Sequence, residues 1–91
     1  MVTEVEFLDL VTDFVAARIA ARKNNYLDPR YIELSDAISK LDSSSWFDRL
    51  QDRLEWDLIN GVDVQASRLE LSIYYHEKVA KKPFITVANN L

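Results

Sequence analysis

The chain has 91 residues, a formal charge of −4, a hydrophobic content of 48% and no cysteine. These values indicate one globular domain and exclude disulfides and thiolate chemistry. A pI near 4.8 disfavours general binding to nucleic-acid phosphates, which requires a basic face. We find no basic N-terminal segment followed by an apolar run, and no run long enough to cross a bilayer. We therefore expect a soluble cytoplasmic protein with no membrane contact.

The first helix is predicted over residues 4–23. Thr3 and Glu6 have the spacing of a capping box, in which each side chain accepts a hydrogen bond from the backbone amide of the other residue. Acidic residues occupy the first turns and basic residues the last, which suits the helix dipole. Arg18 falls within the apolar face of this helix, and we interpret it as a side chain whose stem packs while its charged end reaches water. The alternative is an ion pair at a contact between two helices.

Two further helices are predicted over residues 29–41 and 46–60, where apolar residues recur at helical spacing. Asp28 and Pro29 suit the N-cap and first helical position of the earlier helix. Gly61 is the only glycine in the chain and marks the end of the later helix. The short polar stretches between the helices favour antiparallel neighbours in a bundle.

Residues 64–81 are predicted to form a fourth helix, and it has two apolar stripes. One stripe consists of Val64, Leu71, Tyr75 and Val79, and the nearly opposite stripe consists of Ala66, Leu69, Ile73 and Ala80. A helix that is apolar on two sides is normally buried on two sides. We therefore expect the rest of the chain, a second copy or a partner to cover the second stripe. If the chain covers it, Leu69→Ala and Leu71→Ala should each cost about 2–5 kcal/mol of stability.

The same stretch allows a second interpretation, because apolar and polar residues alternate over 68–76 with the period of a strand. Residues 84–87 would then be its hairpin partner. The stretch is longer than a usual strand, and several of its residues favour helix. The prediction is therefore an all-α fold, a small antiparallel bundle of three longer helices and one short helix. An extended apolar tail follows over residues 83–91, and an α+β fold with a C-terminal hairpin is the alternative.

Catalytic chemistry has little support in this sequence. His76 is the only histidine, and a lone histidine on a helix is more often packed or solvated than catalytic. Asp48, Asp52 and Glu55 project from one side of the third helix and could hold a divalent cation, although such a row is more often a solvated face. A Gly-rich phosphate loop and zinc-type ligand spacing are both missing. We expect no enzymatic activity, no cofactor and no metal.

Nucleic-acid binding is the third-ranked hypothesis, and it depends on one cluster of basic residues. Arg18, Arg22, Lys23 and Arg30 could form a basic corner near the first turn. The helix over 46–60 would, however, present its acidic side chains to the phosphates, which repel them. We therefore expect no nucleic-acid partner.

The surface with most functional information is the non-core side of the helix over 46–60, which carries Asp52, Glu55, Trp56 and Ile59. An exposed Trp among acids would anchor a partner protein, and the acids would favour a basic partner. The second helix or the tail could instead cover Trp56.

The main functional hypothesis is binding of another protein, as a small adaptor, inhibitor or immunity-type factor. Small acidic helical proteins without cysteine are common among accessory proteins of bacteria and phages that bind another protein. This association rests on the general class of protein and on no shared motif. The alternative is a homo-oligomeric structural or regulatory subunit that assembles through the second stripe of the fourth helix.

Overall fold

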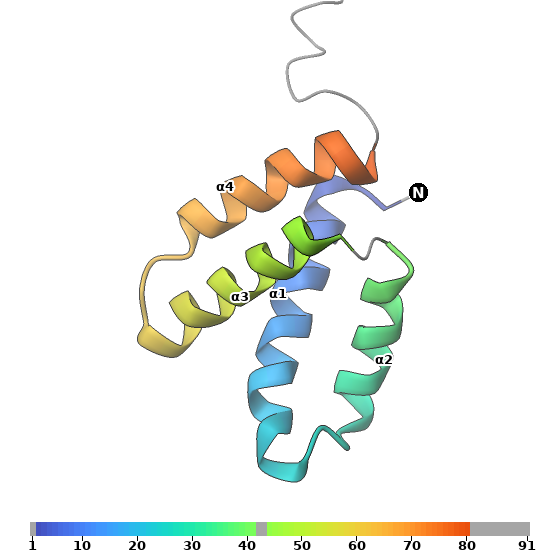
Figure 1. Ribbon diagram of the computed structural model, residues 1–91, viewed down its shortest axis with the longest axis vertical. Coiled ribbons are helices and arrows are strands. Elements are labelled where there is room, and N and C mark those ends of the chain that lie inside the picture. The colour runs from blue at the N-terminus through green and yellow to red at the C-terminus, as the bar shows by residue number, and fades with distance from the viewer. Residues whose placement is uncertain (1, 42–43, 81–91) are drawn as a thin grey trace, which may run out of the picture.

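The computed structural model describes residues 2–41 and 44–80, and these residues are almost entirely helical (Figure 1). The α-helices are α1 (Glu4–Ala21), α2 (Pro29–Ser39), α3 (Ser45–Asn60) and α4 (Gln65–Tyr74), with a 3-10 turn at Arg22–Asn24 and a π-helical turn at Tyr75–Val79. The predicted all-α fold is confirmed, and the stretch 68–76 is helix, not strand. The hairpin partner proposed at 84–87 and the tail over 83–91 lie outside the described residues.

The helices form two antiparallel pairs, α1 with α2 and α3 with α4, and the second pair crosses α1 (Figure 1). Within the described part of the chain, the backbone of α1 lies close to those of α2, α3 and α4, whereas α2 lies close to α1 alone. The first helix is therefore the element on which the others are assembled.

The predicted caps are present where the sequence placed them. The Thr3 hydroxyl accepts from the Glu6 amide at 3.2 Å, and the Glu6 carboxylate accepts from the Thr3 amide at 3.0 Å. The Asp28 carboxylate accepts from the amide of Arg30 at 2.8 Å, at the start of α2. Gly61 ends α3 with a φ of 67°, a left-handed conformation that costs little only for glycine. These caps satisfy backbone groups that helix ends leave unpaired.

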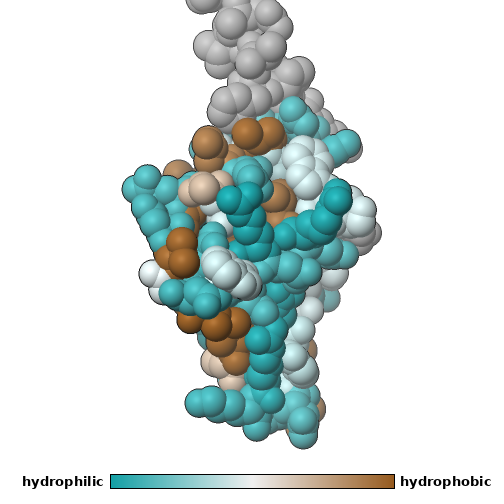
Figure 2. Space-filling model, turned by 60° about the vertical axis from the view of Figure 1, so that its left-hand side comes forward, coloured by the Kyte–Doolittle hydropathy of each residue, from teal (hydrophilic) through white to brown (hydrophobic). Residues whose placement is uncertain are grey.

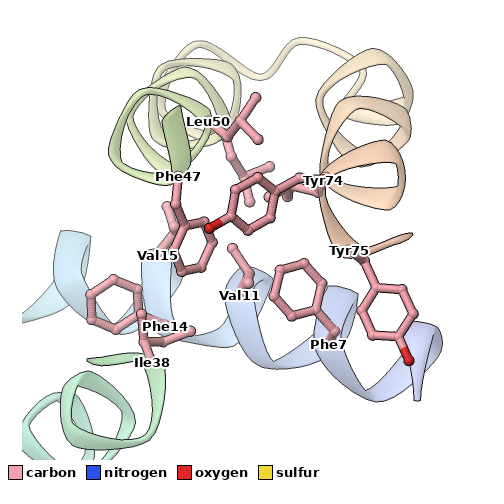
Figure 3. Close-up of a cluster of buried hydrophobic side chains, with 11 residues drawn as sticks. Phe7, Val11, Phe14, Val15, Ile38, Phe47, Leu50, Tyr74 and Tyr75 are labelled. Atoms are coloured by element: carbon pink, nitrogen blue, oxygen red, sulfur yellow. The ribbon is translucent and has the colours of Figure 1, made fainter. Parts of the chain in front are cut away.

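Five of the eleven buried core residues are aromatic, and α1, α3, α4 and the π turn contribute these rings (Figure 3). Phe47 stacks on Tyr74 with ring centroids 4.9 Å apart, and Phe7 lies 5.8 Å from Phe47. The Tyr74 ring is fully buried, and its hydroxyl lies 3.2 Å from the hydroxyl of Ser44, which caps α3. Large aromatic side chains bury much apolar area each, so a few rings can hold a domain of this size together.

The two apolar stripes expected on the fourth helix differ in burial. Leu71 is fully buried and Tyr75 nearly so, as predicted for the first stripe. Leu69, on the second stripe, is 57% exposed. Of the three covers expected for the second stripe, the described part of the chain does not supply one at Leu69. The reason is that α1 and α3 both contact α4 from the Leu71 side, and no described helix lies over the opposite side.

Ala80 also departs from the predicted second stripe. The Ala80 amide donates to the Tyr75 carbonyl at 2.8 Å, the wider hydrogen bond that defines a π turn. The extra residue in this turn changes the helical register, so that Val79 and Ala80 both pack against the core cluster. The exposed stripe of α4 therefore ends at Ile73, which is half-buried.

The unequal burial of the two stripes predicts unequal stability effects. We expect Leu71→Ala to lower the free energy of unfolding by about 2–5 kcal/mol, because it removes a fully buried side chain. Leu69→Ala should change it by less than about 0.5 kcal/mol, the size typical of surface sites. Urea denaturation followed by circular dichroism measures both. Equal losses for the two variants would show that the second stripe is covered in solution.

Candidate protein-binding site

The candidate site lies on the side of α3 that faces away from the core. Phe47, Leu50 and Leu54 point inward from this helix and are buried. Trp56 is 60% exposed and Ile59, three residues further on, is 54% exposed. No described part of the chain covers these two side chains. The two therefore form an exposed apolar patch, which we call the Trp56 patch.

The acids next to this patch bind α1. Arg18 Nε donates to Glu55 Oε1 at 2.7 Å, and Arg22 pairs with the other oxygen of the same carboxylate. Arg18 also reaches Asp52, with Nη2 3.3 Å from Oδ1. The Glu55 side chain is only 14% exposed, whereas that of Asp52 is 75% exposed. Of the two predicted acidic contacts, Asp52 remains accessible to a partner and Glu55 is largely enclosed within the fold.

The interpretation of Arg18 as a side chain that reaches water is wrong. Its side chain is only 18% exposed, and its guanidinium pairs with two acids of α3 and lies 5.6 Å from the centre of the Phe14 ring. The alternative, an ion pair at a contact between helices, is what the structure shows. The sequence signal was a cation inside an apolar face, together with two acids three residues apart on another helix, whose carboxylates can bind different nitrogens of one guanidinium.

The two arginines keep Glu55 in its charged form. Burial by itself would raise the pKa of the Glu55 carboxyl, but hydrogen bonds from Arg22 and Arg18, together with their charges, lower its pKa overall. A carboxyl held in this way is ionised at neutral pH. Glu55 therefore serves to join α1 to α3, and it is poorly suited to donate a proton as a general acid.

A second set of polar contacts joins α3 to α4, and these contacts were not predicted from the sequence. Arg53 pairs with Glu70 at 2.5 Å, and the hydroxyl of buried Ser67 donates to the buried carboxylate of Asp57. The residues involved are four apart on α3 and three apart on α4, so each set lies on one face of its helix. Their polarity gave no reason to place them at an interface. The Arg53–Glu70 pair separates the Trp56 patch from the exposed side of α4.

Figure 2 shows the molecule from the side that carries the turn between α3 and α4. On this side apolar side chains form several separate groups, with hydrophilic side chains between them. The exposed apolar surface is thus divided into patches. This division is consistent with separate small contact areas instead of one continuous interface.

Of the remaining candidates, His76 has structural partners. His76 pairs with Glu4 of α1 and meets the Tyr75 ring edge-on at 5.2 Å. Asp48 is exposed and joins neither arginine of the Glu55 junction. Among the residues described, no group of three or more His, Cys, Asp or Glu is placed to hold a metal ion.

The basic corner is also largely paired. Arg18 and Arg22 bind the acids of α3, and Arg30 lies 3.8 Å from Asp13. Lys23 is the member of this set without an ion pair in the described part of the chain. One free lysine is a poor basis for contact with a phosphate backbone.

In comparisons with known proteins, no family model, no curated protein and no solved structure matches the chain. Within residues 2–41 and 44–80, no helix combines the length and apolarity needed to span a membrane. The function is therefore inferred from the geometry of the side chains alone.

The lowered pKa of Glu55 predicts a dependence of stability on pH. We expect Glu55→Gln to lower the free energy of unfolding at pH 7 by about 1–3 kcal/mol, since it weakens charge-assisted hydrogen bonds at a half-buried site. The folded protein binds the Glu55 proton less readily than the unfolded chain does. The extra free energy of unfolding of the wild type over Glu55→Gln is therefore fully present above the ordinary glutamate pKa of about 4.3. It is lost as the pH falls through the pKa of Glu55 in the folded protein.

Denaturation at a series of pH values measures this difference, and Glu77→Gln is a matched control because Glu77 is exposed. The control should change stability little at any pH. A Glu55→Gln deficit that persists unchanged at pH 3 would show that the carboxylate charge has no part in the junction.

Proposed function

We propose that this protein is a non-enzymatic protein-binding module, a small adaptor, inhibitor or immunity-type factor of the cytoplasm, with Trp56 as its anchor. The observation that carries the proposal is the 60% exposure of Trp56 on the non-core side of α3. Tryptophan is one of the three residue types most enriched among those that dominate binding energies at protein interfaces.

The energetics of Trp56 favour a binding role over a folding role. Phe47, Leu50 and Leu54 already supply the core contact of α3, so the indole adds little to folding. An aromatic side chain offers about 150–250 Å² of surface. Covering the exposed part of the indole would stabilise a complex by about 2–4 kcal/mol at 25 cal/mol per Å². Such an energy is available only if a partner excludes water from the ring.

The surroundings of Trp56 favour a preorganised site. Its helix is fixed at one side by Glu55 with Arg18, and at the other by Arg53 with Glu70. A side chain on a rigid helix loses less conformational freedom on binding than one on a loop. The exposed carboxylate of Asp52 and the net charge of −4 would speed encounter with a basic partner.

The prediction for this site is that Trp56→Ala weakens partner binding by at least about 2 kcal/mol, the size expected of an aromatic anchor. The same change should alter the free energy of unfolding by less than about 0.5 kcal/mol, because the side chain is mostly exposed. The partner is first found by affinity capture from the native host, and binding is then measured by calorimetry with the purified partner. Ile32→Ala is the matched control, because Ile32 is 53% exposed on α2.

Tryptophan fluorescence of a Trp46→Phe variant isolates Trp56 and tests its environment directly. We expect emission typical of a water-exposed indole in the free protein, shifting to the blue when the partner is added. Blue emission from the dilute free protein, with a large loss of stability on Trp56→Ala, would show that Trp56 belongs to the core. That result would remove the site.

A further inference from the structure

The turn between α3 and α4 begins with a pair of residues that favours a spontaneous backbone reaction. Asn60 is the last residue of α3, and Gly61 follows it. An asparagine before a glycine is the pair most prone to deamidation, because glycine has no side chain to hinder attack by its backbone nitrogen. The chain has four other asparagines, and none of them precedes a glycine. Asn60 and Gly61 are both exposed, and the turn lies at the margin of the molecule, on the side away from α2 (Figure 1).

Deamidation at this pair requires only water. The Gly61 nitrogen loses its proton and bonds to Cγ of Asn60, the bond from Cγ to Nδ2 breaks, and ammonia leaves. The product is a cyclic succinimide, which water opens at either of its two carbonyls. One opening gives aspartate, and the other gives isoaspartate, in which the main chain runs through the side chain. Either product has a negative charge at residue 60 in place of a neutral amide.

The folded structure holds both reacting groups out of position. The Gly61 amide donates to the carbonyls of Asp57 and Leu58, in the cap that ends α3. The Asn60 side chain lies back along the helix, where its Nδ2 donates to the Trp56 carbonyl at 2.8 Å. Its Cγ is thereby directed toward the preceding turn and away from the next residue in the chain. Closure of the ring requires Asn60 to leave the helical conformation and these hydrogen bonds to break.

The last turn of α3 must therefore open before the reaction occurs, and Asp57 is the residue that keeps it closed. The Asp57 carbonyl accepts from the Val62 amide at 3.0 Å, and its carboxylate accepts from the buried Ser67 hydroxyl of α4. Asp57 thus holds both the turn and the first residues of α4 against the end of α3. Because helix ends open locally more often than a domain unfolds, the rate of reaction should follow the population of this open state.

We propose that Asn60 is a site of spontaneous deamidation and that local opening of the α3–α4 turn controls its rate. The modified residue favours the open state, because a negative charge at the C-terminal end of a helix opposes the helix dipole. Its carboxylate also has no proton to donate to the Trp56 carbonyl, and Asp63 adds further negative charge close along the chain. One opening event is thereby converted into a lasting change at the end of α3. This inference does not depend on the binding role proposed for Trp56.

The first test compares the reaction in the folded and the unfolded full-length protein. The protein is incubated at one pH in guanidinium chloride or in sodium chloride of equal concentration, and peptide mass spectrometry measures the aspartate and isoaspartate formed. In the unfolded chain we expect Asn60 to react faster than Asn24 or Asn25, which precede residues that have side chains. In the folded protein Asn60 should react at least about tenfold more slowly than in the unfolded chain, since only the open fraction is reactive.

Two serine variants test whether the contact at Asp57 controls the reaction. Ser67→Ala removes the hydroxyl that binds the Asp57 carboxylate. It should raise the rate at Asn60 in the folded protein by about threefold or more and leave the rate in guanidinium chloride unchanged. Ser39→Ala is the matched control, because Ser39 is exposed at the end of α2 and its hydroxyl donates only to a carbonyl of its own helix. Circular dichroism verifies that both variants are folded, and the comparison of folded with unfolded wild type requires neither of them.

The variant Asn60→Asp reproduces the aspartate product and tests its effect on the turn. Hydrogen exchange at the Gly61 and Val62 amides, which both donate to the end of α3, should be faster in this variant than in the wild type. Asn24→Asp introduces the same charge at the end of α1 and should leave the exchange of these two amides unchanged.

Four results would overturn the proposal. Faster modification of another asparagine in the unfolded chain would remove Asn60 as the reactive site. Equal rates at Asn60 in the folded and unfolded protein would show that the turn gives no protection. An unchanged rate in folded Ser67→Ala would show that opening at Asp57 does not control the reaction. Unchanged hydrogen exchange at Gly61 and Val62 in Asn60→Asp would show that the product does not favour the open state.

Discussion

The whole fold depends on the burial of one face of α1. Phe7 and Val11 are fully buried on that face, and the rings that cover them come from α3 and α4. Phe47 of α3 and Tyr74 of α4 stack on each other next to Phe7 of α1. Each of these three helices therefore needs the other two to keep its aromatic side chain away from water. Because these three rings lie against one another, removing any of them would leave a cavity bordered by the other two.

The polar contacts around this core set how the helices are turned relative to one another. Arg18 and Arg22 fix α3 against the C-terminal half of α1, and the hydroxyl of Tyr75 donates to the Val2 carbonyl at 2.6 Å at the other end of α1. Apolar packing alone tolerates rotation and sliding of helices, whereas paired charges and hydrogen bonds have preferred directions. The consequence is that the Trp56 patch has a fixed position on the surface.

The exposed apolar side chains of α3 and α4 result from the same feature of the architecture. The pair α3–α4 contacts α1 on one side, and α2 lies close to α1 only. One side of each of α3 and α4 is therefore left without a covering helix. In a chain with 48% hydrophobic residues, some exposed aliphatic side chains are normal, but an exposed Trp on the outer side of α3 is a more specific feature. It is the basis of the binding function proposed for this protein.

The sequence by itself determined the local structure. Thr3 with Glu6, Asp28 with Pro29, and Gly61 define helix ends through backbone groups a few residues away, so their effect can be predicted without knowing the fold. Helical spacing likewise identified the buried faces of α1 and α3 and the Leu71 stripe of α4. The position of Trp56 away from the α3 core stripe also followed from periodicity, which requires only the geometry of one helix.

Only the tertiary structure decided which surfaces are covered and which charges are paired. Arg18 pairs with acids more than thirty positions away in the chain, and nothing in its local sequence specifies that α3 rather than water would receive it. Leu69 and Leu71 are equally apolar, yet α1 and α3 bury only Leu71 because both approach α4 from that side. The π turn that brings Ala80 to the core is another example. Periodicity places a residue on a face of its helix, and the packing of other helices determines whether that face meets protein or water.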